Sequence, residues 1–239
     1  MEYPQAKPRI LLITDSRGRG LKNLLNNSLN HKYEIFENIL SGSTIETLAD
    51  WIETETNRLG HLDAVILIGG ICNFTSKETY RTCHGQMNII RYQERIDTTQ
   101  IRGRLEALID QLQRRLIIAT IPPASLIKYL EEQERRRGIR IPEGERGRLL
   151  EDLASQQRDL EWDIEDLNKW IIEKNKELAK PTLDFHNQVY KTSKKKQRAR
   201  SRRVRKFCDE DLRDGVHPNH SLLVKLCMRL DDTVTKTIN

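Results

Sequence analysis

The chain has 239 residues, of which 37% are hydrophobic and 32% are charged, and its formal net charge is +6. This composition excludes a fibrous repeat and a disordered tail, and the length suits one large α/β domain or two small ones. The apolar runs are far shorter than the roughly 20 residues that cross a bilayer, and residues 1–9 hold no apolar leader. We therefore expect an intracellular protein, cytoplasmic or nuclear, without membrane contact. Four cysteines without CxxC spacing argue against a zinc site.

Short, continuous apolar blocks predict the strands. Blocks of this length, bounded by Gly, Pro or charged residues, are typical of strands buried on both faces of a parallel sheet. In chain order they are Ile10–Ile13, Tyr33–Leu40, Ala64–Ile68, Leu116–Ile121 and a short fifth block, Thr182–Phe185. Helical patterns lie between or after them at Thr44–Leu59, Ile101–Arg115 and Ser221–Thr237. The alternation predicts one doubly wound α/β domain over residues 1–239, a three-layer α/β/α sandwich of flavodoxin-like type.

Residues 122–180 form a charged, helix-prone insertion in that fold. Apolar residues recur there at steps of three, four and seven, which predicts one apolar stripe along a long helix: Leu149, Leu153, Leu160, Ile164, Leu167 and Ile171. The stripe would pack on the sheet or on a hairpin partner at Ala124–Arg137. A dimer seam is the alternative, so a monomer and a homodimer through this helix both stay open.

Polar residues and glycines follow the predicted strands, at the edge where open parallel sheets carry their chemistry. Taken alone, each has a structural explanation, such as a helix cap at Asp15 or Ser16 or an ordinary turn glycine. Together, Ser16, His217 and Asp214 form the set that acyl transfer needs: a nucleophile, a base and a carboxylate that orients the base. In a tight turn, an Asp three residues before a His reaches one ring nitrogen and leaves the other free for the serine proton.

Four blocks in this order resemble the SGNH (GDSL-type) hydrolases: DSRGRGL from Asp15, SGSTIETL from Ser41, GGICNFT from Gly69 and DGVHPN from Asp214. The resemblance spans almost the whole chain and implies a five-stranded parallel sheet between helices. It also implies esterase or acetylhydrolase chemistry on a small ester without metal or cofactor. Ser16, Asp214 and His217 would be catalytic. The oxyanion hole would be formed by the amides of Ser16 and Gly42 and the side chain of Asn73.

Two blocks depart from the family pattern. Thr14 stands where the family has a glycine before the first Asp-Ser pair. In the third block, alignment without a gap puts Cys72 at the oxyanion position and Asn73 one residue late. A bulge in this loop would return the Asn73 side chain to the oxyanion hole. Without such a bulge the hole would lose one donor, which is worth about 100- to 1000-fold in rate.

The positive charge is concentrated in one segment. Lys191–Lys206 holds 10 basic residues and no acidic one, which leaves 31 basic against 35 acidic residues elsewhere. We expect residues 191–206 to form a basic loop. The loop is either a disordered or nuclear-import segment, or a segment that binds the backbone phosphates of RNA or another polyanion. The candidate contacts are Lys194, Lys195, Lys196, Arg198, Arg200, Arg202, Arg203, Arg205 and Lys206. The alternative function is thus a weakly active or inactive SGNH-like module that binds nucleic acid.

Overall fold

A four-stranded parallel sheet forms the centre of the molecule. The computed structural model describes residues 6–28, 32–94, 96–197 and 200–238, with the side chains of 192–206 outside the described part. The strand order is β2-β1-β3-β6. Their bounds are β1 Arg9–Thr14, β2 Glu34–Ile39, β3 Ala64–Ile68 and β6 Leu116–Ile118. All three pairings are parallel, as the continuous apolar blocks predict.

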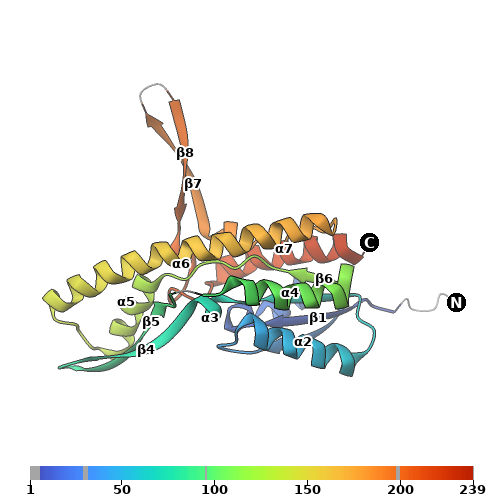
Figure 1. Ribbon diagram of the computed structural model, residues 1–239, viewed down its shortest axis with the longest axis horizontal. Coiled ribbons are helices and arrows are strands. Elements are labelled where there is room, and N and C mark those ends of the chain that lie inside the picture. Colours follow the sequence, from blue (N-terminus) through green and yellow to red (C-terminus); the bar gives the residue numbers. More distant parts are fainter. Residues whose placement is uncertain (1–5, 29–31, 95, 198–199, 239) are drawn as a thin grey trace.

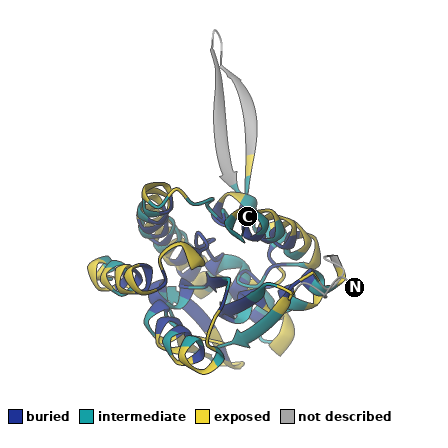
Figure 2. Ribbon diagram, turned by 90° about the vertical axis from the view of Figure 1, so that its right-hand side faces the viewer, coloured by how far each residue is buried: buried dark blue, intermediate teal, exposed yellow. Residues whose placement is uncertain are grey.

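Helices cover both faces of this sheet (Figure 1). Leu11 and Ile13 of β1 point into one apolar cluster, and Ile10 and Leu12 point into the other, because side chains alternate along a strand. The first cluster receives α2 (Ile45–Leu59), α4 (Thr98–Leu112) and the long helix α6 (Glu143–Glu177). The second receives α1 (Leu21–Ser28) and α7 (His220–Ile238). Figure 2 shows the buried residues gathered between these layers.

The expected fifth strand, Thr182–Phe185, is reduced to one residue. Leu183 makes an isolated parallel bridge to Ala119 beyond the end of β6, and its carbonyl accepts from the Thr120 N–H at 3.0 Å. The next residue, Asp184, accepts from the Asn187 N–H at 3.0 Å, so the chain turns at once into the 3-10 helix His186–Val189. The described sheet therefore has four strands, and the predicted five-strand count is not confirmed.

The insertion at 122–180 forms a helical hairpin of α5 (Leu126–Arg137) and α6. All six residues of the predicted apolar stripe are buried on α6 within the larger cluster. Asn168 on the same face pairs with the chain beyond β6, since its amide accepts from the Ile121 N–H at 2.7 Å and donates to the Ile121 carbonyl at 2.8 Å. Within the described residues, no helix is both long and apolar enough to span a membrane.

Two antiparallel hairpins complete the structure, and neither was expected from the sequence. One pairs β4 (Thr75–Thr82) with β5 (Gly85–Tyr92). The other pairs β7 (Tyr190–Gln197) with β8 (Arg200–Phe207) and projects from the body of the molecule (Figure 1). The prediction of a basic loop over 191–206 is therefore wrong as to secondary structure. The two halves of the segment pair through their backbones and form a hairpin. The pairing extends one step beyond the strands, where the Cys208 N–H donates to the Val189 carbonyl at 2.8 Å.

Replacing Leu160 with Ala tests the packing of α6. Leu160 is fully buried, so the variant should lower the free energy of unfolding by about 2–5 kcal/mol, as measured by chemical denaturation. Trp162→Ala on the same helix is the control, because Trp162 is 74% exposed and its loss should cost less than about 1 kcal/mol. Equal losses in the two variants would contradict the placement of the stripe.

Candidate active site

Ser16 lies at the carboxyl edge of the sheet, in the 3-10 helix Ser16–Gly18 that directly follows β1. Asp15 caps this turn: its Oδ1 accepts from the Arg17 N–H at 2.8 Å. Its own N–H donates to the Ile68 carbonyl at 3.0 Å, which ties the turn to the end of β3. At Gly18 a β-carbon would lie 2.1 Å from the Thr14 hydroxyl oxygen, so only glycine fits this turn.

His217 and Asp214 lie on the loop that precedes α7. Asp214 Oδ1 accepts from the backbone N–H groups of Val216 at 3.2 Å and His217 at 2.8 Å, which closes a tight turn. Within that turn His217 Nδ1 lies 2.9 Å from Asp214 Oδ2. Gly215 has a φ of +82°, and its carbonyl accepts from the Ser125 N–H at 2.7 Å, so the turn is fastened to the start of α5.

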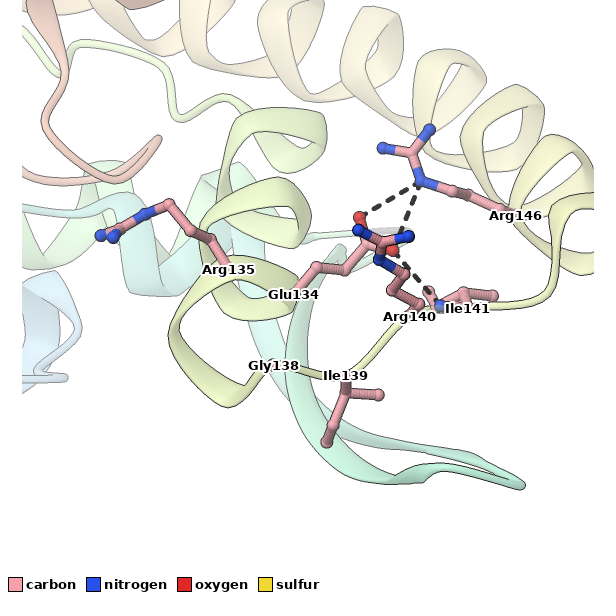
Figure 3. A pocket seen from close by; sticks show the side chains of 7 residues that line it. All are labelled: Glu134, Arg135, Gly138, Ile139, Arg140, Ile141 and Arg146. Atoms are coloured by element: carbon pink, nitrogen blue, oxygen red, sulfur yellow. Dashed lines mark hydrogen bonds and ion pairs between the residues drawn. The ribbon is translucent and has the colours of Figure 1, made fainter.

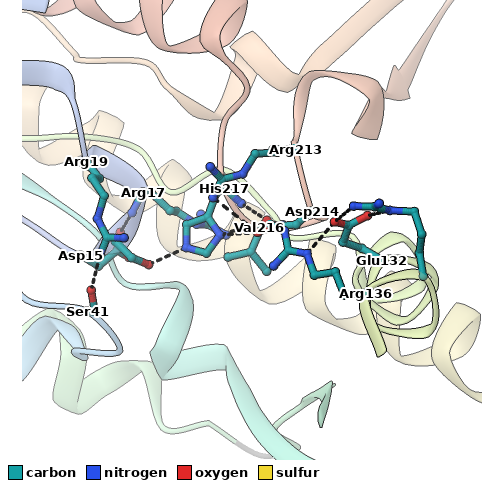
Figure 4. A network of polar contacts seen from close by, with 12 residues as sticks. Asp15, Arg17, Arg19, Ser41, Glu132, Arg136, Arg213, Asp214, Val216 and His217 are labelled. Carbon is teal, nitrogen blue, oxygen red and sulfur yellow. Dashed lines mark hydrogen bonds and ion pairs between the residues drawn. The ribbon is translucent and has the colours of Figure 1, made fainter. Parts of the chain in front are cut away.

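The two segments, 201 residues apart in sequence, meet at one hydrogen bond. His217 Nε2 lies 2.9 Å from Ser16 Oγ. The Nδ1 atom of the same ring faces Asp214 (Figure 4). The structure therefore brings Ser16, His217 and Asp214 into one continuous chain of hydrogen bonds. This arrangement allows the imidazole to accept the serine proton at one nitrogen while a carboxylate holds the other.

The electrostatics keep Asp214 ionised. Asp214 is only 4% exposed, and burial alone would raise its pKa. The hydrogen bonds from the His217 ring and from two backbone N–H groups outweigh that effect, so the pKa of Asp214 lies well below its usual value. The guanidinium groups of Arg136 and Arg213 lie 3.7 Å from Asp214 Oδ2 and favour the same charged state.

Asp15 and Arg17, on either side of Ser16, are two further ionisable residues that are buried. Burial raises the pKa of Asp15, and burial lowers the pKa of Arg17. The Arg17 guanidinium donates to the Pro122 carbonyl, which connects the turn of Ser16 to the chain beyond β6. The burial of Arg17 could not be predicted from its sequence context, because a surface arginine in a glycine-rich turn has the same local pattern.

A cavity of about 340 Å³ opens on Ser16 and His217. Its apolar lining comes from the helix α3 (Ile71–Phe74), from β5 and from the loop before α7. Hydroxyl groups come from the 3-10 helix of Ser16, from the loop after β2, from β4 and from α5. Neither Ser16 N–H nor Gly42 N–H donates to another described residue, and Gly42, with a φ of +80°, lies on the cavity wall. The lining residues are Ser16, Arg19, Ser41, Gly42, Ile71, Cys72, Thr75, Ser76, Lys77, Ile90, Tyr129, Val216 and His217.

A larger cavity of about 550 Å³ lies at the far end of the helical hairpin, around the connection between α5 and α6 (Figure 3). Glu134 spans it, accepting from Arg146 Nε at 3.2 Å and from the Ile141 N–H at 3.5 Å. Its lining contains no serine, cysteine or histidine. This cavity therefore lacks the groups for nucleophilic catalysis, and the smaller cavity at Ser16 is the candidate active site.

No family model and no curated protein matches the chain, but solved structures do. LAE5, an α/β hydrolase enzyme from the metagenome of Lake Arreo in Spain, aligns over 98% of this chain and 97% of its own, with 14% identity and a TM-score of 0.55. The acetyl xylan esterase AlAXEase aligns over 94% and 98%, with 15% identity and a TM-score of 0.44. AlinE4, an SGNH-hydrolase family esterase, aligns over 50% and 62%, with 16% identity and a TM-score of 0.36.

The names of these similar structures include an SGNH-hydrolase family esterase, the family that the four sequence blocks resemble. At these identities the likeness to LAE5 shows the fold, an α/β hydrolase-like arrangement with a parallel sheet. The roles of the residues must be argued from their own geometry.

Asn73 does not take the SGNH position that was expected of it. Its Oδ1 accepts from the Ile45 N–H at 2.8 Å, and its Nδ2 donates to Glu46 Oε2 at 2.7 Å. Asn73 thus holds the first turn of α2, and Cys72 lines the cavity in its place. The chain forms a regular helical turn from Ile71, with the Asn73 N–H donating to the Gly70 carbonyl at 3.1 Å, so no bulge shifts Asn73 back.

The candidate nucleic-acid contacts are not tested by the structure. Arg198 lies outside the described residues, and the side chains of Lys194, Lys195, Lys196, Arg200, Arg202, Arg203, Arg205 and Lys206 lie outside them as well. Only the backbone pairing of the hairpin that carries these side chains is described. Binding of RNA or another polyanion stays a prediction from the sequence.

Asn73→Ala separates the two roles considered for this residue. Loss of an oxyanion donor would lower kcat about 100- to 1000-fold. Loss of the bond to the Ile45 N–H would instead lower the free energy of unfolding by about 1–3 kcal/mol, because it leaves a buried donor unpaired. We expect the second result, with kcat little changed, from denaturation and steady-state kinetics. A large loss of kcat in a variant of normal stability would contradict it.

The depressed pKa of Asp214 predicts a pH-dependent contribution to stability. A carboxyl whose folded-state pKa lies below its unfolded value stabilises the fold above about pH 4, and that contribution is lost as the pH falls through the folded-state pKa. The difference in unfolding free energy between the wild type and Asp214→Asn should therefore be largest at neutral pH and should decrease in acid. Denaturation curves at several pH values measure this difference, and a difference independent of pH would refute the assignment.

Proposed function

We propose that the protein is a serine hydrolase that cleaves a small acyl ester, such as an acetyl or short-chain acyl group. The observation that carries the proposal is the hydrogen-bonded chain from Ser16 Oγ through His217 to Asp214, with 2.9 Å at each step. Ser16 and His217 line one cavity together with Gly42, and Asp214 is buried behind His217. The α/β hydrolase-like fold that the chain shares with LAE5 supports the same chemistry.

In this mechanism Ser16 Oγ attacks the ester carbonyl while His217 Nε2 takes the serine proton. Asp214 fixes the ring so that Nδ1 carries hydrogen, and its negative charge stabilises the imidazolium that forms. His217 then gives the proton to the leaving alcohol, which departs and leaves an acyl group on Ser16. A water molecule, deprotonated by the same imidazole, hydrolyses that acyl-enzyme and restores the serine hydroxyl.

The oxyanion would be held by two backbone N–H groups, those of Ser16 and Gly42. Both residues line the cavity, and neither N–H is occupied by another described residue. Because Asn73 is engaged at α2, this hole has one donor fewer than the family pattern implies. One donor is worth about 100- to 1000-fold in kcat, so we expect modest turnover of unactivated esters.

Hydrolysis of a chromogenic short-chain ester tests the proposal. Ser16→Ala and His217→Ala should each lower kcat by about 10³-fold or more, because each removes a member of the proton relay. His220→Ala is the matched control: His220 is the exposed first residue of α7, three positions after His217, and its loss should leave turnover unchanged. Turnover that persists undiminished in Ser16→Ala would end the assignment.

A further inference from the structure

The cavity at Ser16 is unevenly charged. Among its lining residues are two cations, Arg19 and Lys77, and no Asp or Glu. Arg19 follows the Ser16 turn, and Lys77 lies on β4. The two cations therefore reach the cavity from separate elements.

Neither cation is neutralised by a carboxylate of the described residues. Arg19 Nη2 donates to the hydroxyl of Ser41 at 3.1 Å, a neutral partner that holds the guanidinium beside the Gly42 turn (Figure 4). Lys77 is exposed and makes no ion pair within the described part of the chain. Its neighbour in the cavity wall, Cys72, contributes no negative charge near neutral pH, because burial raises the pKa of the thiol.

Two carboxylates of the loops around the cavity, Asp214 and Asp15, are already engaged. Asp214 is held by His217 and faces Arg136 and Arg213, and Asp15 caps its own turn above Arg17. Both are buried. A ligand in the cavity thus meets the positive charge of Arg19 and Lys77 directly, whereas the negative charges lie behind the wall with cations beside them.

We propose that the ester substrate carries an anionic group, a carboxylate or a phosphate, which Arg19 and Lys77 bind within a few bonds of the scissile carbonyl. The inference rests on the proposed hydrolase function and specifies the substrate class of that same site. A guanidinium and an ammonium both recognise oxyanions through charge-assisted hydrogen bonds. The imidazole and Ser16 remain free for the reaction, because the anion is held by other residues.

Binding to the Ser16→Ala variant tests the substrate class independently of turnover. Two matched pairs serve as ligands in calorimetric or NMR titrations: phenyl butyrate against phenyl hydrogen succinate, and 1-acetylglycerol against 1-acetylglycerol 3-phosphate. The first pair places a carboxylate on the acyl side, and the second places a phosphate on the alcohol side. We expect the charged member of at least one pair to bind about tenfold more tightly, and the preference to weaken as salt is added.

Removing the charges of Arg19 and Lys77 tests whether these two residues cause the preference for the charged ligand. In the Ser16→Ala background, Arg19→Gln with Lys77→Gln should bring the two affinities of that pair together. Arg81→Gln should keep the preference, because Arg81 also lies on β4 and is exposed but does not line the cavity. Equal affinities within both pairs would overturn the inference, as would a preference that survives the double replacement or falls equally in Arg81→Gln. Failure of the wild type to hydrolyse any of the four esters, by contrast, would overturn the proposed function.

Discussion

The parallel register of β1 with its two neighbours determines where Ser16, Gly42 and Cys72 lie. Thr14 stands opposite Ile39 of β2 and Ile68 of β3, so three strands end at the same level. Backbone bonds continue that register past the strands, from the Leu40 N–H to the Thr14 carbonyl at 2.8 Å and from the Asp15 N–H to the Ile68 carbonyl at 3.0 Å. The loops that bear Ser16, Gly42 and Cys72 therefore begin at one edge, and the cavity is the space between them.

Much of this arrangement could be predicted because it depends on local patterns. The strands are continuous apolar blocks, the α6 stripe repeats at helical spacing, and Asp214 and His217 are close enough in sequence to form a turn by themselves. Ser16 was predictable as a nucleophile only because its block resembles a family and follows a strand. In each of these cases, short-range sequence contains the physical cause of the structure.

The features that sequence did not reveal depend on distant partners. Asn73 is turned toward α2 because it accepts from the Ile45 N–H, which has no partner within the helix, and donates to the Glu46 carboxylate. No pattern in the third block indicates this contact. The fifth strand fails because Asp184 starts a turn immediately after Leu183. The hairpins β4–β5 and β7–β8 join polar segments, in which the alternation that normally indicates strands is weak.

The hydrogen bond between the Gly215 carbonyl and the Ser125 N–H couples the helical hairpin to the imidazole. At Gly215 a β-carbon would lie 2.5 Å from the Ser125 carbonyl oxygen and 2.6 Å from the Tyr129 nitrogen, so the loop and α5 touch along their backbones. Arg136, about two turns beyond Tyr129 on α5, reaches Asp214 from the same helix. The helical hairpin of α5 and α6 therefore helps to position the loop that bears Asp214 and His217. A shortened chain that joined residue 122 directly to residue 181 would keep all four strands, yet it would lose the contacts by which α5 holds the loop of Asp214 and His217.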